Sequence, residues 1–331
     1  MTNEDIKKFY HGAYRFEETD DGYLLGCQFT KEQTEYFIKN EKPGDYFYSR
    51  SYLSTAKTLE FISEATEMSL EYKLKFHCEE TIDICIDGLV TESYKGTDID
   101  KCGELKLRFC EGIKNIVTYL PAYDVMYIKN LRLNADAKPV YKPTKVLWMG
   151  DSITQGYGAF MSSETYVSVA NRILNYEVLN QGVGGYYFDK NILTKMDGYT
   201  PDKIIIAHGT NQCLRENRYI ELKEYFEVLS KIYKNIPTLV ITPVWRNKFE
   251  TTSSDGTSEF NYAKEKSEKF IDFCKQIKTE AEKYPNIKVL DGFKLLHHDK
   301  IYFMDDHLHP NALGSEVLGR NIADAIIKMG F

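Results

Sequence analysis

Four short motifs contain residue types that can do nucleophilic chemistry. In chain order they are Gly150-Asp-Ser-Ile-Thr154, Asn180-Gln-Gly-Val-Gly-Gly185, Gly209-Thr-Asn211 and Asp306-His-Leu-His-Pro310. A serine attacks a carbonyl carbon when a histidine takes its proton and a carboxylate orients that histidine. Backbone N–H groups and amide side chains can stabilise the oxyanion that then develops. The motifs offer one candidate for each of these tasks.

The candidate nucleophile is Ser152, which follows the short apolar run Val146–Met149. The small residue two positions earlier, Gly150, allows a sharp turn that would leave the hydroxyl exposed at the edge of a sheet. The motif is not the G-x-S-x-G elbow of α/β-hydrolases, because position 154 is Thr. A serine here could also serve only as a helix cap, so this motif alone is a weak signal.

The candidate base is His309. A spacing of three residues places Asp306 and His309 on the same side of one turn, so that the carboxylate can hold the imidazole. Asp305 is an alternative partner for the ring. We expect Asp151 to be a structural hydrogen-bonding residue whose side chain points away from Ser152.

The other two motifs offer oxyanion donors. The loop that ends at Gly185 could present a backbone N–H, and Asn211 could present its side-chain amide. Each also has a simpler interpretation, since glycine-rich loops often form tight turns and an Asn after a strand often caps a helix.

Three further residues follow predicted strands and could line a substrate site: His208, Trp245 and Arg246. A tryptophan can stack on a sugar and an arginine can bind a carboxylate or a hydroxyl. A buried histidine with a structural role is an equal alternative for His208. The polar segment Thr251–Thr257 is long enough to act as a flap.

Two halves of the chain have different patterns. Before about residue 135, apolar and polar residues alternate with almost no helical pattern, and turn residues separate the runs, which predicts an antiparallel β-sandwich. The expected strands are Met68–Phe76, Thr81–Gly88, Glu104–Cys110, Asn115–Leu120 and Met126–Leu133.

The second half alternates short, continuous apolar runs with segments of helical period. This pattern predicts a mostly parallel sheet with helices on both faces, a three-layer α/β/α arrangement. The predicted strands include Val146–Met149, Val178–Leu179, Ile204–Ala207, Leu239–Thr242 and Val289–Leu290. We therefore expect an N-terminal domain at 1–138, a linker at 139–144 and a C-terminal domain at 145–331.

Taken together, the four motifs resemble those of the SGNH/GDSL hydrolases, whose four named residues would be Ser152, Gly185, Asn211 and His309. The resemblance covers about residues 145–331 and implies a flavodoxin-like fold. The first half is similar to the jelly-roll domain of two-domain members such as the carbohydrate esterases of family 2. One position departs from the family, because Gln212 stands where an Asp usually follows the Asn.

The resemblance implies a serine ester hydrolase that acts through an acyl-serine, without a metal or an organic cofactor. Ser152, Asp306 and His309 would form the catalytic triad, and the N–H groups of Ser152 and Gly185 with the Asn211 amide would form the oxyanion hole. The expected substrate is an acetyl or other short-chain ester of a sugar or similar polar alcohol, as a small molecule or an oligosaccharide.

Several alternatives stay open. The same triad could serve an acyltransferase, and a thioesterase or lipase is a weaker candidate because no long apolar stretch suggests an acyl-chain tunnel. A protein of another class, a glycan-binding sandwich with an inactive hydrolase domain, is a further possibility. A metal-dependent deacetylase would instead use the clustered residues His297, His298, Asp305, Asp306, His307 and His309.

The composition of the chain argues against several other classes of protein. The net charge of −7 argues against nucleic acid as the main partner, and no segment approaches the ~18 consecutive apolar residues of a membrane span. The N-terminal residues are charged and do not form the apolar stretch of a signal peptide. Seven irregularly spaced cysteines predict free thiols in a reducing compartment. We therefore expect a cytoplasmic protein that does not bind membranes.

Overall fold

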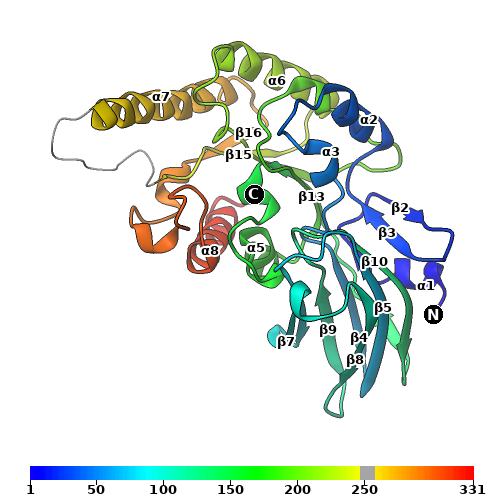
Figure 1. Cartoon of the computed structure of the whole chain (residues 1–331). Coiled ribbons are helices and arrows are strands. Elements are labelled where there is room, and N and C mark those ends of the chain that lie inside the picture. The colour runs from blue at the N-terminus through cyan, green and yellow to red at the C-terminus, as the bar shows by residue number, and fades with distance from the viewer. Residues whose placement is uncertain (247–257) are drawn as a thin grey trace.

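The computed structural model describes residues 1–246 and 258–331, with side chains to Arg246 and again from Lys264. Antiparallel sheets make up most of the N-terminal half, and a parallel sheet with its helices makes up the C-terminal half. The two parts lie side by side, with α5 (Tyr166–Leu174) next to the antiparallel strands (Figure 1).

The N-terminal half contains two antiparallel sheets. The first has the order β1-β4-β9-β6-β7, with β11 paired to β4, and the second has the order β2-β3-β10-β5-β8. Strands of the first sheet are β1 (Tyr10–His11), β4 (Thr58–Ser63), β6 (Thr81–Ile86), β7 (Leu89–Lys95), β9 (Lys114–Tyr119) and β11 (Ala137–Pro139). Strands of the second are β2 (Arg15–Glu18), β3 (Leu24–Cys27), β5 (Glu67–Leu74), β8 (Cys102–Arg108) and β10 (Met126–Leu133).

A single apolar core lies between these sheets. Leu59 and Ile84 of the first sheet pack in the same cluster as Leu70 and Ile128 of the second. The alternating pattern arises because every second residue of these strands enters this core. The predicted β-sandwich is confirmed.

The prediction of almost no helix in this half was wrong. The structure contains α1 (Asn3–Lys7), α2 (Lys31–Asn40) and α3 (Phe47–Arg50). Thr30 and Gln33 form a reciprocal capping box at the start of α2. The buried residues of α2 are Gln33, Thr34 and Phe37, so its inner face is largely polar and leaves only a weak apolar period in the sequence.

The C-terminal half contains one parallel sheet with the strand order β13-β12-β14-β15-β16. All of its described strand pairs are parallel. The strands are β12 (Lys145–Gly150), β13 (Glu177–Gly182), β14 (Lys203–Ala207), β15 (Thr238–Ile241) and β16 (Ile287–Leu290). The first strand of this half is therefore flanked by the second and the third, as in flavodoxin-like sheets.

Helices cover both faces of this sheet. Leu147 and Met149 of β12 share a core with residues of α6 (Arg218–Ile232) and α7 (Ser258–Ala281). Val146 and Trp148 share the opposite core with residues of α5 and α8 (Ala312–Lys328). Because neighbouring residues of each strand are buried on opposite sides, the strands are apolar without alternation. The predicted three-layer α/β/α arrangement is confirmed.

The predicted linker lies between β11, which ends at Pro139, and β12, which begins at Lys145. The division into two domains at this segment stays a prediction. All seven cysteines lie in the described residues and are free thiols.

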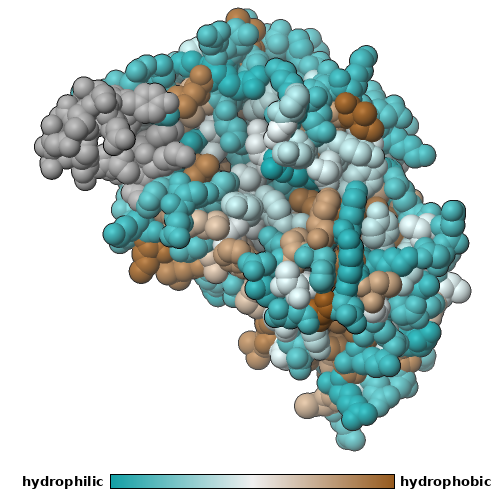
Figure 2. Space-filling model, in the orientation of Figure 1, coloured by the Kyte–Doolittle hydropathy of each residue, from teal (hydrophilic) through white to brown (hydrophobic). Residues whose placement is uncertain are grey.

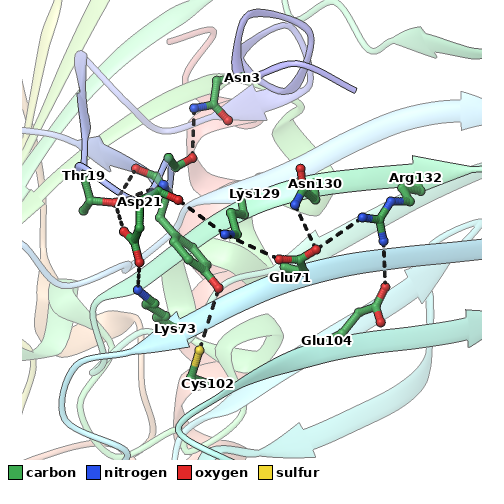
Figure 3. A network of polar contacts seen from close by, with 12 residues as sticks. Asn3, Thr19, Asp21, Glu71, Lys73, Cys102, Glu104, Lys129, Asn130 and Arg132 are labelled. Carbon is green, nitrogen blue, oxygen red and sulfur yellow. Dashed lines mark hydrogen bonds and ion pairs between the residues drawn. The ribbon is translucent and has the colours of Figure 1, made fainter.

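Ion pairs cross the outer face of the second antiparallel sheet (Figure 3). Glu71 of β5 pairs with Lys129 and Arg132 of β10, and Arg132 also reaches Glu104 of β8. Such opposite charges on neighbouring strands favour one strand register, although exposed pairs contribute little to stability.

The view in Figure 2 presents a mostly hydrophilic surface with apolar residues in small, separate groups. Within residues 1–246 and 258–331, no helix combines the length and the apolar character needed to cross a membrane.

Candidate active site

Ser152 is the first residue of α4 (Ser152–Gln155), directly after β12. The Asp151 carboxylate accepts the backbone N–H of Ile153 at 3.1 Å and so caps this short helix. A Cβ atom on Gly150 would lie 1.9 Å from Oγ1 of Thr154, so only glycine allows the chain to turn this sharply. The turn holds Ser152 at the carboxyl end of a central strand.

This cap is the kind of structural hydrogen bond expected of Asp151. Asp151 is 2% exposed, and burial raises the pKa of its carboxyl group to about 7.

His309 lies in the loop before α8. Its Nε2 is 2.7 Å from Oγ of Ser152, and its Nδ1 is 2.5 Å from Oδ2 of Asp306. A carboxylate at Nδ1 favours the tautomer with the proton on that nitrogen, which leaves Nε2 free to accept the serine proton. The three side chains thus form one hydrogen-bonded chain from hydroxyl to carboxylate.

The backbone around Asp306 holds its carboxylate in place. Oδ1 accepts the N–H groups of Leu308 and His309 at 2.9 and 3.0 Å, and His307 adopts a left-handed conformation in the tight turn between them. Burial opposes ionisation of Asp306, but the hydrogen bonds from the His309 ring and backbone outweigh it and lower the pKa. Asp306, and not Asp305, is the partner of the ring.

A tyrosine that the sequence did not suggest packs on the histidine. The ring of Tyr157 meets that of His309 edge to face, with centroids 4.6 Å apart, and remains 39% exposed. The ring of Tyr123, from the N-terminal half, packs against that of Tyr157, with centroids 5.3 Å apart. These contacts restrict the orientation of the imidazole and form an aromatic rim beside the serine.

The loops that carry Gly185 and Asn211 lie on either side of Ser152. The first follows β13 and the second follows β14, and these two strands flank β12. Nδ2 of Asn211 donates to the carbonyl of Tyr186 at 3.0 Å, which ties the loops together. Gly185 is exposed and has a φ of 82°, in the left-handed region that favours glycine.

Gln212, which departs from the family pattern, is fully buried. Its Oε1 accepts the N–H of Phe188 at 3.0 Å, and its Nε2 donates to Glu221 at 2.6 Å. The amide thus uses both ends to join the loop after β13 to α6. An uncharged side chain suits this place beside Glu221 because an aspartate would repel it.

The three predicted lining residues are largely buried. His208, at 2% exposure, packs among the rings of Tyr186, Phe188 and Tyr225, and burial lowers its pKa to about 3. Burial leaves this side chain little surface for a substrate, so its lining role stays a prediction.

Trp245 and Arg246 are 4% and 8% exposed. The indole stacks on His298 with centroids 4.7 Å apart, while Nη2 of Arg246 donates to the carbonyl of Thr210, next to Asn211. Their role in lining the site also stays a prediction. The proposed flap Thr251–Thr257 lies outside the described residues.

The histidine cluster is dispersed. His298 stacks on Trp245, His297 lies near Tyr302, and His309 contacts Ser152. Within the part of the chain that the structure describes, no group of three or more His, Cys, Asp or Glu residues could hold a metal ion.

The site lies in a part of the chain that matches a known protein family. Residues 148–317 match the model of the GDSL-like lipase/acylhydrolase family, a range that includes Ser152, Gly185, Asn211, Asp306 and His309. The curated proteins contain no match to this sequence.

Several solved structures share the fold. A salicylyl-acyltransferase from a tetracycline biosynthetic pathway aligns with a TM-score of 0.73 at 16% identity, over 97% of this chain and 95% of its own. A family two carbohydrate esterase from Clostridium thermocellum, in complex with cellohexaose, aligns with a TM-score of 0.62 at 13% sequence identity, over 97% of this chain and 98% of its own. An acetyl xylan esterase from the rumen bacterium Butyrivibrio proteoclasticus aligns with a TM-score of 0.58 at 15% sequence identity, over 83% of this chain and 91% of its own. At such identities the likeness concerns the fold.

Proposed function

Because this chain belongs to the GDSL-like lipase/acylhydrolase family, we propose that it hydrolyses a carboxylic ester through an acyl-serine on Ser152. The observation that carries the proposal is the hydrogen-bonded chain from Ser152 through His309 to Asp306. This arrangement provides a nucleophile, a base and a group that orients the base.

In the first half-reaction, Oγ of Ser152 attacks the ester carbonyl carbon and its proton passes to Nε2 of His309. The carbonyl electron pair moves to oxygen and forms the tetrahedral oxyanion. When this intermediate collapses, the bond to the alcohol oxygen breaks and the alcohol takes the proton from Nε2. Water then repeats the sequence on the acyl-serine and releases the acid. Asp306 stabilises the imidazolium in both halves.

The oxyanion would accept hydrogen bonds from the backbone N–H groups of Ser152 and Gly185 and from the Asn211 amide. The placement of the three residues around one strand end supports this assignment. Tyr186 already holds the Asn211 amide by its carbonyl, so the donor needs little reorganisation when charge develops.

For the substrate we propose an acetyl or other short acyl ester of a sugar or similar polar alcohol. The exposed ring of Tyr157 beside His309 offers a surface on which a sugar ring could stack. Two proteins with this fold are named as a family two carbohydrate esterase and an acetyl xylan esterase. The comparison to make is kcat/KM for acetylated xylo-oligosaccharides against p-nitrophenyl octanoate; preference for the octanoyl ester would contradict this substrate class.

An acyltransferase is the second candidate, because a protein with this fold is named as a salicylyl-acyltransferase. The acyl-serine would then pass its acyl group to an alcohol instead of water. Product analysis in the presence of added glycosides distinguishes the two, since a hydrolase releases mainly the free acid.

Intact-protein mass spectrometry tests the acyl-serine directly. After mixing with p-nitrophenyl acetate, His309→Ala should retain any acetyl group that reaches Ser152, because the base needed for deacylation is missing. Ser152→Ala should gain no mass. Equal acetylation of Ser152→Ala, or a label at another residue, would contradict the assignment.

A further inference from the structure

Arg50, from the N-terminal half, crosses the loop that carries Gly185. It is the last residue of α3, which lies close to β13 in Figure 1. Its Nη1 donates to the carbonyl of Gly184 at 2.8 Å and to that of Asp45 at 2.9 Å. One guanidinium nitrogen therefore links the two halves of the chain beside the candidate oxyanion hole.

The carbonyl of Gly184 and the N–H of Gly185 belong to the same planar peptide group. Because that group is rigid, a bond that fixes the carbonyl also fixes the direction of the N–H on the opposite side. Donation from a cationic guanidinium also polarises the peptide and strengthens its N–H as a donor.

We propose that Arg50 is the positioning residue of the Gly185 oxyanion donor, so that the N-terminal half completes the active site. This inference depends on the proposed function, because it assumes that the Gly185 N–H binds the oxyanion.

A second set of contacts holds the same loop. Oε1 of Gln155 accepts the N–H of Gly184 at 2.8 Å, while its Nε2 donates to the Arg50 carbonyl at 2.9 Å. Gly184 is thus held at its N–H by Gln155 and at its carbonyl by Arg50, and Gln155 connects the two. The two peptide groups on either side of the Gly184 Cα therefore have little freedom to rotate.

Gly184 and Gly185 are explained by different features of the loop. A Cβ on Gly184 would lie 3.2 Å from Oε1 of Gln155 and 3.3 Å from Cδ of Arg50, which is a tight fit, whereas Gly185 has a φ of 82°, in the region that favours glycine. The loop also shares an apolar cluster with the N-terminal half, in which Phe37 and Phe47 pack against Tyr186. The side chain of Arg50 therefore packs directly against Gly184 and Gly185.

The test compares Arg50→Ala, Arg50→Lys and a control, Glu177→Gln, using p-nitrophenyl acetate. Glu177 lies at the opposite end of β13 and pairs with His11 of the N-terminal half, so its substitution weakens the contact between the halves away from the loop.

Loss of one oxyanion donor costs about 10²–10³ in rate, so loss of its positioning residue should lower kcat by about 10- to 100-fold with KM changed less than about threefold. Affinity for a boronic acid, whose tetrahedral adduct places an oxygen in the same hole, should fall in parallel. Arg50→Lys should recover part of the loss, because it keeps a cationic donor, and Glu177→Gln should retain wild-type kcat.

Two results would overturn the proposal while leaving the function intact. One is wild-type kcat in Arg50→Ala while Ser152→Ala is inactive. The other is an equal loss of kcat in Glu177→Gln, which would assign the effect to contact between the halves in general. If Arg50→Ala does not fold, unchanged kcat and boronic acid affinity in Arg50→Met would contradict the proposal in the same way. Inactivity of the wild type on every ester would instead refute the proposed function itself.

Discussion

Asp306 binds both the ring and the backbone of His309. Oδ2 lies 2.5 Å from the ring Nδ1, and Oδ1 accepts the N–H of the same residue at 3.0 Å. One carboxylate therefore fixes the position of the base, its orientation and its tautomer.

Asp306→Asn should lower kcat/KM by about 10²–10⁴, because an amide can hold the ring but cannot stabilise the imidazolium and can favour the wrong tautomer. Ser152→Ala and His309→Ala should lower kcat/KM by as much or more. Steady-state kinetics on p-nitrophenyl acetate provide the comparison. Wild-type kcat/KM in Asp306→Asn would mean that another group orients His309.

Asn211→Ala should lower kcat by about 10²–10³ with little change in KM, since the oxyanion exists only after attack on the carbonyl. The lost bond to the Tyr186 carbonyl complicates this experiment, so unfolding curves should accompany the kinetics. A change confined to KM would assign Asn211 to substrate binding.

Gln212→Ala should reduce the free energy of unfolding by about 1–3 kcal/mol, because it leaves the buried N–H of Phe188 without its partner. Urea denaturation measures this change. Gln212→Glu should also destabilise the fold by placing a second carboxylate beside Glu221. If both variants unfold at the wild-type midpoint, the bridge between the loop and α6 contributes nothing.

Asp151 should make stability depend on pH. Burial raises its pKa from 3.8 to about 7, so the folded protein holds a proton at this site that the unfolded chain has already released between those values. The free energy of unfolding contributed by this group should therefore fall as pH rises from about 4 to about 7. Asp151→Asn keeps an oxygen for Ile153 and should lose less stability than wild type between pH 5 and pH 8. If the free energy of unfolding changed with pH in the same way in wild type and in Asp151→Asn, the raised pKa of Asp151 would be contradicted.

The sequence predicted those features of the protein that depend on neighbouring residues in the chain. The strand ends at Gly150 and Ala207 follow apolar runs that are visible without a structure, and the spacing from Asp306 to His309 suffices to suggest their pairing. The antiparallel sheets and the parallel sheet were predictable for the same reason, since residues such as Leu70 and Leu147 mark buried positions by their period.

Contacts between distant segments were not predictable in this way. Arg50 reaches Gly184 across 134 positions of sequence, and nothing near Arg50 signals this. The helix α2 was not predicted either, because its inner face is largely polar and it lies within a region of strands. His208 also shows this limit, because its position at a strand end does not reveal that the rings of Tyr186 and Phe188 pack around it.

The central claim is that Ser152 is the nucleophile of an ester hydrolase, and one assay tests it most directly. Hydrolysis of p-nitrophenyl acetate is measured for wild type and Ser152→Ala side by side, each with and without a chelator. We expect turnover by wild type that the chelator does not change and that Ser152→Ala lacks. Turnover that survives in Ser152→Ala and disappears with the chelator would contradict the claim and point to a metal-dependent site.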